Sequence, residues 1–203
     1  MLITTGFQPL FQGTFTQEEI EKGYAPARRD WPEVITDPAQ FAKLLRQRKL
    51  VSYGGFGVVY EVDGAAIKIG CIAEDEAQAQ QWVYETYESA LPVWAYSHDV
   101  ELPKAVTHEV CPHHGHLANR WDRDSVECHC GDRLGVLVMP LGQAPYPEHS
   151  QDEGIELGER ISQALEEKFG FGFDERLCNH LSFRGRLMLC DFGDPQSVEA
   201  GYW

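Results

Sequence analysis

The stretch that decides the fold covers residues 52–69 and reads SYGGFGVVYEVDGAAIKI. Its two β-rich runs, Phe56–Val62 and Ala65–Ile69, are separated by Asp63-Gly64, a strong signal for a β-hairpin. Glycines ahead of the first run allow backbone N–H groups to approach a phosphate without a Cβ in the way. Taken alone, an ordinary glycine-rich hairpin explains the same residues.

The second run carries a lysine within an otherwise apolar strand. Side chains alternate between the two faces of a strand, so Ala66 and Lys68 share one face. We therefore expect Lys68 to project from a central strand beneath the glycine turn, where a cation can hold the α- and β-phosphates of a nucleotide. The alternative is a solvated lysine at a sheet edge.

Two segments further along carry oxygen ligands: residues 173–179 read FDERLCN and residues 187–193 read LMLCDFG. With Asp174 five residues before Asn179, one loop presents a carboxylate to a hydroxyl nucleophile and an amide oxygen to a metal. A strand over Arg186–Cys190 then delivers the carboxylate of Asp191. Hard oxygen ligands that bridge phosphates are what Mg²⁺ prefers.

The order of these features resembles the protein kinase-like family: a glycine-rich loop, A-I-K, D-x-x-x-x-N and D-F-G, over roughly residues 50–195. The style is similar to short kinase-like proteins of tailed bacteriophages. Those proteins also compress the C-terminal lobe and carry an F-D-x-x-x-x-N loop followed by a strand that ends in Asp-Pro, as Asp194-Pro195 does here. The resemblance implies ATP and Mg²⁺ as cofactors.

The resemblance also implies roles for individual residues. Asp174 is the implied catalytic base, and Arg176 neutralises the transferring phosphate. Lys68 holds the α/β-phosphates and pairs with a helix carboxylate, for which Glu85 is the first choice and Glu88 the next. The remaining implied residues are the phosphate-covering Gly54, Gly55 and Gly57, the Mg²⁺ ligands Asn179 and Asp191, and the hinge residues Met139 and Leu141, whose backbone would meet the adenine edge.

The chain departs from the family pattern in three places. Ser52 replaces the first glycine of the loop, and Gly172-Phe173 replaces the usual His-Arg before the catalytic Asp. Ten residues follow Gly193, too few for an activation segment and a large helical substrate-binding lobe. We therefore expect a minimal substrate platform, which leaves a pseudokinase open as an alternative.

A Cys/His-rich insertion covers residues 111–131 and is flanked by stretches of β character over 102–111 and 134–141. Cys111-Pro-x-His114-Gly has the form of a zinc knuckle with His in place of the second Cys. Cys128-x-Cys130-Gly would complete a closed Cys₃His zinc site of structural type at the tip of a hairpin. Rival ligands are His113, His116 and His129, and a polar loop with free cysteines is the alternative.

Composition limits the partners. The chain of 203 residues has 17 Lys and Arg against 32 Asp and Glu, a formal net charge of −15. Such a surface repels phosphate backbones and anionic lipid, which argues against generic nucleic-acid or membrane binding. No segment approaches the ~18–20 apolar residues of a membrane span. Met1–Phe11 has no Lys or Arg ahead of a hydrophobic run, so it does not look like a signal peptide. We expect a reduced, cytoplasmic protein (in host cytoplasm if phage-encoded).

The expected fold class is α+β: a small antiparallel sheet lobe with one packed helix, then a reduced helical lobe. Helices are expected from Asp37-Pro38 onward, over 73–90 and over 155–169. We expect an N-terminal arm over 1–36 and a minimal kinase-like domain over 37–203. Its N-lobe covers about 37–139, with the insertion inside it, and its reduced C-lobe about 143–203.

The expected function is ATP- and Mg²⁺-dependent transfer of a phosphoryl group to a Ser/Thr hydroxyl of a host or partner protein, with a small-molecule hydroxyl as a variant. The alternative from another class is an interaction protein of pseudokinase type, which binds a partner through its acidic surface and zinc hairpin. A third idea, acidic mimicry of nucleic acid, depends on charge alone.

Overall fold

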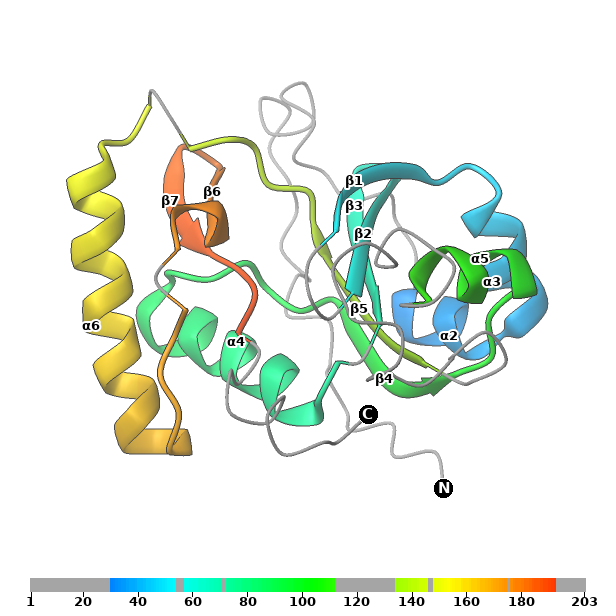
Figure 1. Cartoon of the computed structure of the whole chain (residues 1–203), viewed down its shortest axis with the longest axis horizontal. Coiled ribbons are helices and arrows are strands. Elements are labelled where there is room, and N and C mark those ends of the chain that lie inside the picture. Colours follow the sequence, from blue (N-terminus) through cyan, green and yellow to red (C-terminus); the bar gives the residue numbers. More distant parts are fainter. Residues whose placement is uncertain are drawn as a thin grey trace.

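The computed structural model of the chain describes residues 30–53, 57–70, 72–111, 134–145, 148–174 and 176–192. They form an α+β fold around a five-stranded antiparallel sheet with the strand order β1-β2-β3-β5-β4 (Figure 1). Its strands are β1 (Lys49–Tyr53), β2 (Gly57–Val62), β3 (Ala65–Gly70), β4 (Ala95–Val100) and β5 (Leu134–Pro140). A second sheet pairs β6 (His180–Phe183) with β7 (Arg186–Leu189).

The hairpin predicted from residues 52–69 is confirmed. β2 and β3 pair in register from Gly57↔Gly70 to Val62↔Ala65. Between them Asp63 has φ 50° and Gly64 φ 78°, so both turn residues are left-handed, as the tightest hairpin turn requires. Because this turn fixes the register, it also fixes the face on which Lys68 lies.

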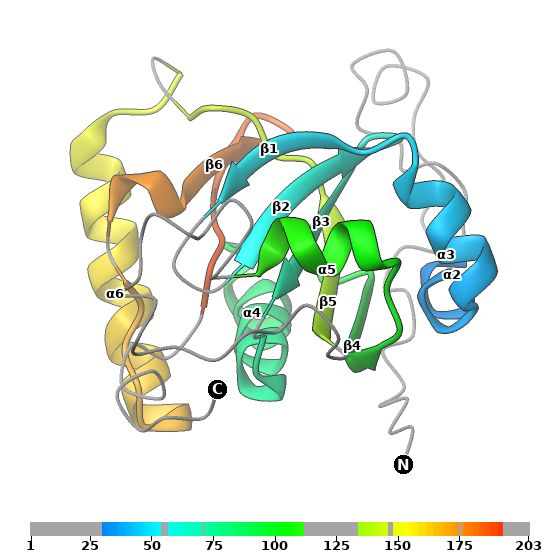
Figure 2. The same cartoon turned by 45° about the vertical axis from the view of Figure 1, so that its right-hand side comes forward.

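Three short helices cover one face of the sheet: α2 (Trp31–Thr36), α3 (Pro38–Leu45) and α5 (Lys104–Val110). Figure 2 shows α5 lying across this face, with α4 (Glu74–Tyr87) on the opposite side of the sheet. The helices bury Trp31, Phe41 and Val106 in a core shared with Val58, Ile67, Val136 and other strand residues. This layer of helices therefore packs against the central strands on the face opposite α4.

Of the N-terminal arm expected over 1–36, the structure describes residues 30–36, where the capped helix α2 buries Trp31, Val34 and Ile35. One expectation for this layer was wrong. The β character expected over 102–111 gives way to helix α5, whose Val106 and Val110 are one turn apart and both buried. Packing against the sheet outweighs the strand preference of these β-branched residues.

The other face of the sheet meets α4 and the β6–β7 hairpin, and α6 (Gln151–Phe169) packs against α4. The helix predicted from Asp37-Pro38 is confirmed as α3, with Asp37 accepting the N–H groups of Ala39 and Gln40 at 3.0 Å. The helix predicted over 155–169 is α6, which begins four residues earlier because Ser150 and Glu153 form a capping box. The sheet and α6 thus enclose α4 and the hairpin between them (Figure 1).

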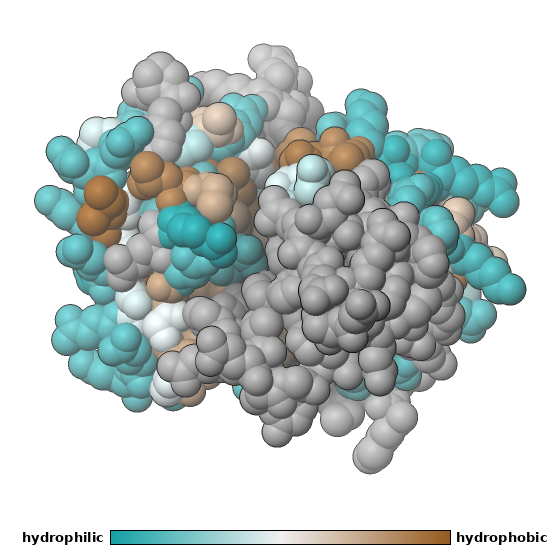
Figure 3. All heavy atoms as spheres, in the orientation of Figure 1, coloured by the Kyte–Doolittle hydropathy of each residue, from teal (hydrophilic) through white to brown (hydrophobic). Residues whose placement is uncertain are grey.

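Hydrophilic side chains line the outer edge of the molecule on the α6 side (Figure 3). The exposed large hydrophobic residues of the described ranges are Leu50, Val51 and Tyr53 on the edge strand β1, together with Ile155 on α6. Of the helices in these ranges, none combines the length and the apolar composition that crossing a membrane requires.

Candidate active site

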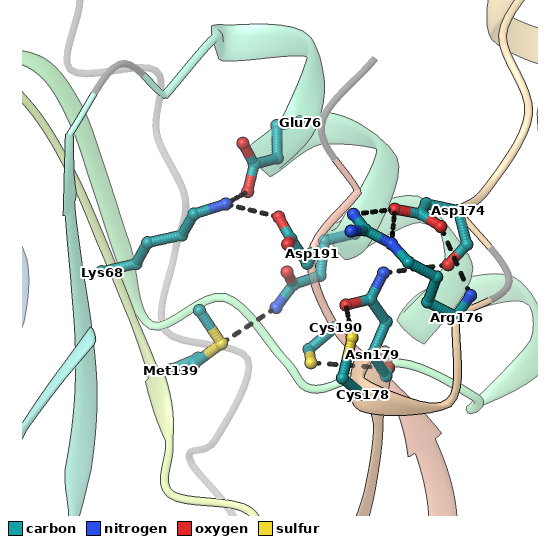
Figure 4. Close-up of polar contacts among 10 residues, drawn as sticks. Lys68, Glu76, Met139, Asp174, Arg176, Cys178, Asn179, Cys190 and Asp191 are labelled. Carbon is teal, nitrogen blue, oxygen red and sulfur yellow. Dashed lines mark hydrogen bonds and ion pairs between the residues drawn. The ribbon is translucent and has the colours of Figure 1, made fainter. Parts of the chain in front are cut away.

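Lys68 occupies a central position on β3, between Val59 of β2 and Leu137 of β5. As its alternation with Ile67 and Ile69 predicts, its side chain lies on the face toward α4. Only 6% of the residue is exposed. Its ammonium group donates hydrogen bonds to Glu76 Oε1 and, at 2.7 Å, to Asp191 Oδ1 (Figure 4). A buried cation is therefore shared by two carboxylates from different parts of the chain.

The carboxylate from α4 is Glu76, and the expectation that Glu85 or Glu88 pairs with Lys68 was wrong. Glu85 accepts a hydrogen bond from Gln81 at 2.9 Å, and Glu88 pairs with Arg186 at 2.6 Å. Glu85 lies nine residues after Glu76, about 13 Å further along the helix axis. The first turn of α4 faces Lys68 because only a short segment joins β3 to α4, and this short connection is the signal in the sequence that indicates Glu76.

Burial and charge act in opposite directions on these three groups. Burial tends to lower the pKa of Lys68, but the two carboxylates outweigh it and raise that pKa above its ordinary value. Burial raises the pKa of Glu76, against the effect of Lys68. Lys68 lowers the pKa of Asp191, against the effect of burial. When all three are ionised they carry a net charge of −1, so the cluster favours a further cation beside Asp191.

The position of Asp191 is fixed by hydrogen bonds on both sides of the strand before it. Leu91 N–H donates to Leu189 O at 3.1 Å, and Leu189 N–H donates to Ser89 O at 2.8 Å. Cys190 N–H donates to Asn179 O at 2.9 Å. Because residues 89–91 follow α4 directly, the segment that carries Asp191 is held to the helix that carries Glu76.

Two glutamines hold α4 in place. Gln80 Nε2 donates to Leu91 O at 2.8 Å, and Gln81 Oε1 accepts the N–H of Val93 at 3.0 Å. Gln80 Nε2 also contacts Met139 Sδ at 3.6 Å, near the end of β5. Sequence reasoning had not singled out either glutamine, because nothing in a local pattern distinguishes a buried glutamine from an exposed one.

The loop before β6 brings together the remaining predicted residues. Asp174 Oδ2 accepts a hydrogen bond from Arg176 Nε at 2.6 Å. Asn179 lies in a short 3₁₀ turn, η1 (Leu177–Asn179), and its Nδ2 donates to Asp174 O at 2.9 Å. Figure 4 shows these residues beside Asp191, and Arg176 also contributes to lowering the pKa of Asp191. The five polar residues that the motifs predict for the site, at positions 68, 174, 176, 179 and 191, therefore lie together.

Asn179 and Asp191 are suited to binding a hard cation. The Asp191 side chain is 38% exposed, so its carboxylate is accessible from outside. Among the contacts drawn in Figure 4, Asn179 Oδ1 accepts one hydrogen bond, at 3.5 Å from the weak S–H donor of Cys178. Both oxygens belong to the ligand types that Mg²⁺ binds. Within the described ranges, His, Cys, Asp and Glu residues form no metal-binding cluster of three or more.

Of the residues predicted for the glycine turn and the hinge, the structure describes Gly57, Met139 and Leu141. Gly57 begins β2, and a Cβ there would lie 2.7 Å from the Ile69 carbonyl oxygen, so the close pairing of β2 with β3 requires glycine. Gly54 and Gly55 lie outside the described residues. Leu141 N–H donates to Gly64 O at 3.1 Å, so this backbone donor of the expected hinge is engaged by the hairpin turn rather than directed to a ligand.

The zinc site stays a prediction. Cys111 is fully buried at the end of α5, while His114, Cys128 and Cys130 lie outside the described residues, as do the rival histidines. The residue that opens the insertion therefore follows a helix rather than the strand that was expected.

Comparison with known proteins assigns no relative to this chain: no protein family, curated protein or solved structure matches it.

Proposed function

We propose that this chain is an ATP- and Mg²⁺-dependent phosphotransferase, a small protein serine/threonine kinase of the kinase-like class that its motif order resembles. The observation that carries the proposal is the ion cluster of Lys68, Glu76 and Asp191, beside a loop that holds Asp174 and Asn179. These residues come from β3, α4, η1 and two loops, and a merely structural salt bridge does not require all of them.

Each residue has a role that its surroundings support. Glu76 is 3% exposed and orients the Lys68 ammonium, which would hold the α/β-phosphates. Asn179 and Asp191 would hold Mg²⁺. When bound, Mg·ATP supplies the phosphoryl group, and its Mg²⁺ neutralises part of the negative charge on the phosphates. Such a site works mainly by positioning and electrostatic stabilisation.

Asp174 is the group proposed to accept the proton of the attacking hydroxyl. The Asp174 side chain is 26% exposed, so an acceptor can reach its carboxylate. Arg176 pairs with Asp174, and its side chain is 67% exposed. It therefore brings a positive charge to the outer edge of the site. The net charge of −15 favours a protein acceptor with a basic segment.

The test is transfer of labelled γ-phosphate from ATP with Mg²⁺, using the wild type and Asp174→Asn. Each is assayed alone, with generic protein substrates and with cell lysate. Label on Ser or Thr with the wild type, and its loss with Asp174→Asn, supports the proposal. ATP binding without transfer in any mixture would overturn the kinase assignment and favour the interaction protein of pseudokinase type.

A further inference from the structure

We propose that His180 is a positioning residue that sets the geometry of the Asp174–Asn179 loop by linking it to α6. The inference rests on the proposed function. His180 is the first residue of β6 and is 1% exposed. Its Nδ1 lies 3.2 Å from Arg176 O and its Nε2 lies 2.8 Å from Gly154 O. One buried ring thus joins a carbonyl of the loop to a carbonyl in the first turn of α6.

The loop carbonyl that His180 reaches is at the centre of the loop's own hydrogen bonds. Arg176 O also accepts the Asn179 N–H at 2.8 Å. Asn179 Nδ2 donates in turn to Asp174 O at 2.9 Å. A shift of Arg176 O therefore moves both the residue proposed as base and a residue proposed as Mg²⁺ ligand, although the hydrogen bonds of the His180 ring go to backbone carbonyls.

Helix α6 is shaped to allow this contact. Gly154 and Gly158 are buried one turn apart, and Ser162 follows one turn later. Ser162 Oγ accepts the Phe173 N–H at 3.0 Å, so the same helix holds the loop at a second point. The absence of side chains at 154 and 158 leaves the backbone open to a neighbouring ring. The Phe173 ring meets His180 edge-on with centroids 6.1 Å apart, which fixes the ring plane.

A neutral imidazole donates through one nitrogen only, so its tautomer decides which of the two carbonyls receives the hydrogen bond. Asn places an amide nitrogen near the position of Nδ1, and Gln places one near the position of Nε2. His180→Asn therefore keeps a donor toward Arg176 O, His180→Gln keeps one toward Gly154 O, and His180→Leu removes any donor at similar volume. Ile161→Val is the control for a general loss of packing, because Ile161 lies on α6 in the core that also contains Phe173.

The test measures kcat and KM for ATP in the full chain, and amide hydrogen exchange of residues 174–179 without nucleotide. We expect His180→Leu to lower kcat on the order of 10- to 100-fold. KM for ATP changes less than kcat, because Lys68 is carried by β3 and not by the loop. Exchange in the loop becomes faster, and whichever of the Asn and Gln variants keeps the donating nitrogen stays closer to the wild type than the other does. Ile161→Val keeps kcat and loop exchange at the wild-type level.

A His180→Leu variant that matches Ile161→Val in both measurements would overturn the inference, as would a raised KM with unchanged kcat. A wild type that transfers no phosphate contradicts the proposed function instead. In that case loop exchange still decides whether His180 holds the loop on α6.

Discussion

At the residue scale, the central feature is one lysine shared by two carboxylates. Lys68 and Glu76 are both nearly inaccessible, and Asp191 completes the cluster from a segment 123 positions away. Burying charges is costly unless they are paired and hydrogen-bonded. The three side chains therefore depend on one another, and loss of one carboxylate leaves the buried ammonium group of Lys68 with an incomplete set of partners.

Glu76→Ala and Glu85→Ala form a matched pair on one helix. We expect Glu76→Ala to lower the free energy of unfolding by about 2–3 kcal/mol, at or below the usual loss for a broken buried pair because Asp191 still pairs with Lys68. Glu85→Ala should change it by less than about 0.5 kcal/mol, since the Glu85 side chain is exposed on the helix surface and bonds Gln81 of the same helix. Urea unfolding measures both, and equal losses would argue against Glu76 as the partner of Lys68.

At the element scale, α6 holds the loop that carries Asp174, and its first turn depends on a capping box. Ser150 Oγ accepts the Glu153 N–H at 3.2 Å, and Glu153 Oε2 accepts the Ser150 N–H at 2.8 Å. The second bond lowers the pKa of the Glu153 carboxyl below its ordinary value. A lowered pKa in the folded protein means that the ionised form stabilises the helix above the ordinary pKa, and that this stabilisation is lost as pH falls through the lowered value.

Glu153→Gln keeps a hydrogen-bonding group at this position but removes its charge. We expect the variant to be less stable than the wild type at neutral pH, and the difference to disappear as the pH falls below about 4. Ser150→Ala, the companion variant, should cost about 1 kcal/mol. Urea unfolding across this pH range checks the expectation, which fails if the Glu153→Gln difference stays constant with pH.

Local sequence patterns predict some elements and not others. The turn at Asp63-Gly64 and the face of Lys68 follow from alternation and turn chemistry, which act between neighbouring residues. Helix α5 does not, because it depends on packing against the sheet. The partner of Lys68 is indicated by the short connection between β3 and α4 and not by a residue pattern within the helix. Gln80 and Gln81 set the position of α4 by bonding Leu91 and Val93, and no local pattern indicates those partners.

At the scale of the whole molecule, the five-stranded sheet and α6 enclose the site from opposite sides (Figure 1). The order of motifs predicted that Lys68, Asp174, Asn179 and Asp191 meet, and the structure brings them together. It does so through the pairing of β7 with the segment after α4 and of Cys190 with Asn179. The motifs do not predict the acceptor side of the proposed kinase, since that depends on surfaces beyond these motifs.

The measurement that tests the central claim most directly is ATP binding by titration calorimetry, with and without Mg²⁺. We expect the folded wild type to bind ATP saturably and more tightly with Mg²⁺. Lys68→Met should abolish binding, Asp191→Asn should remove the Mg²⁺ dependence, and Glu85→Gln should bind as the wild type does. A folded wild type that binds no ATP under either condition would contradict the assignment of this cluster as a nucleotide site.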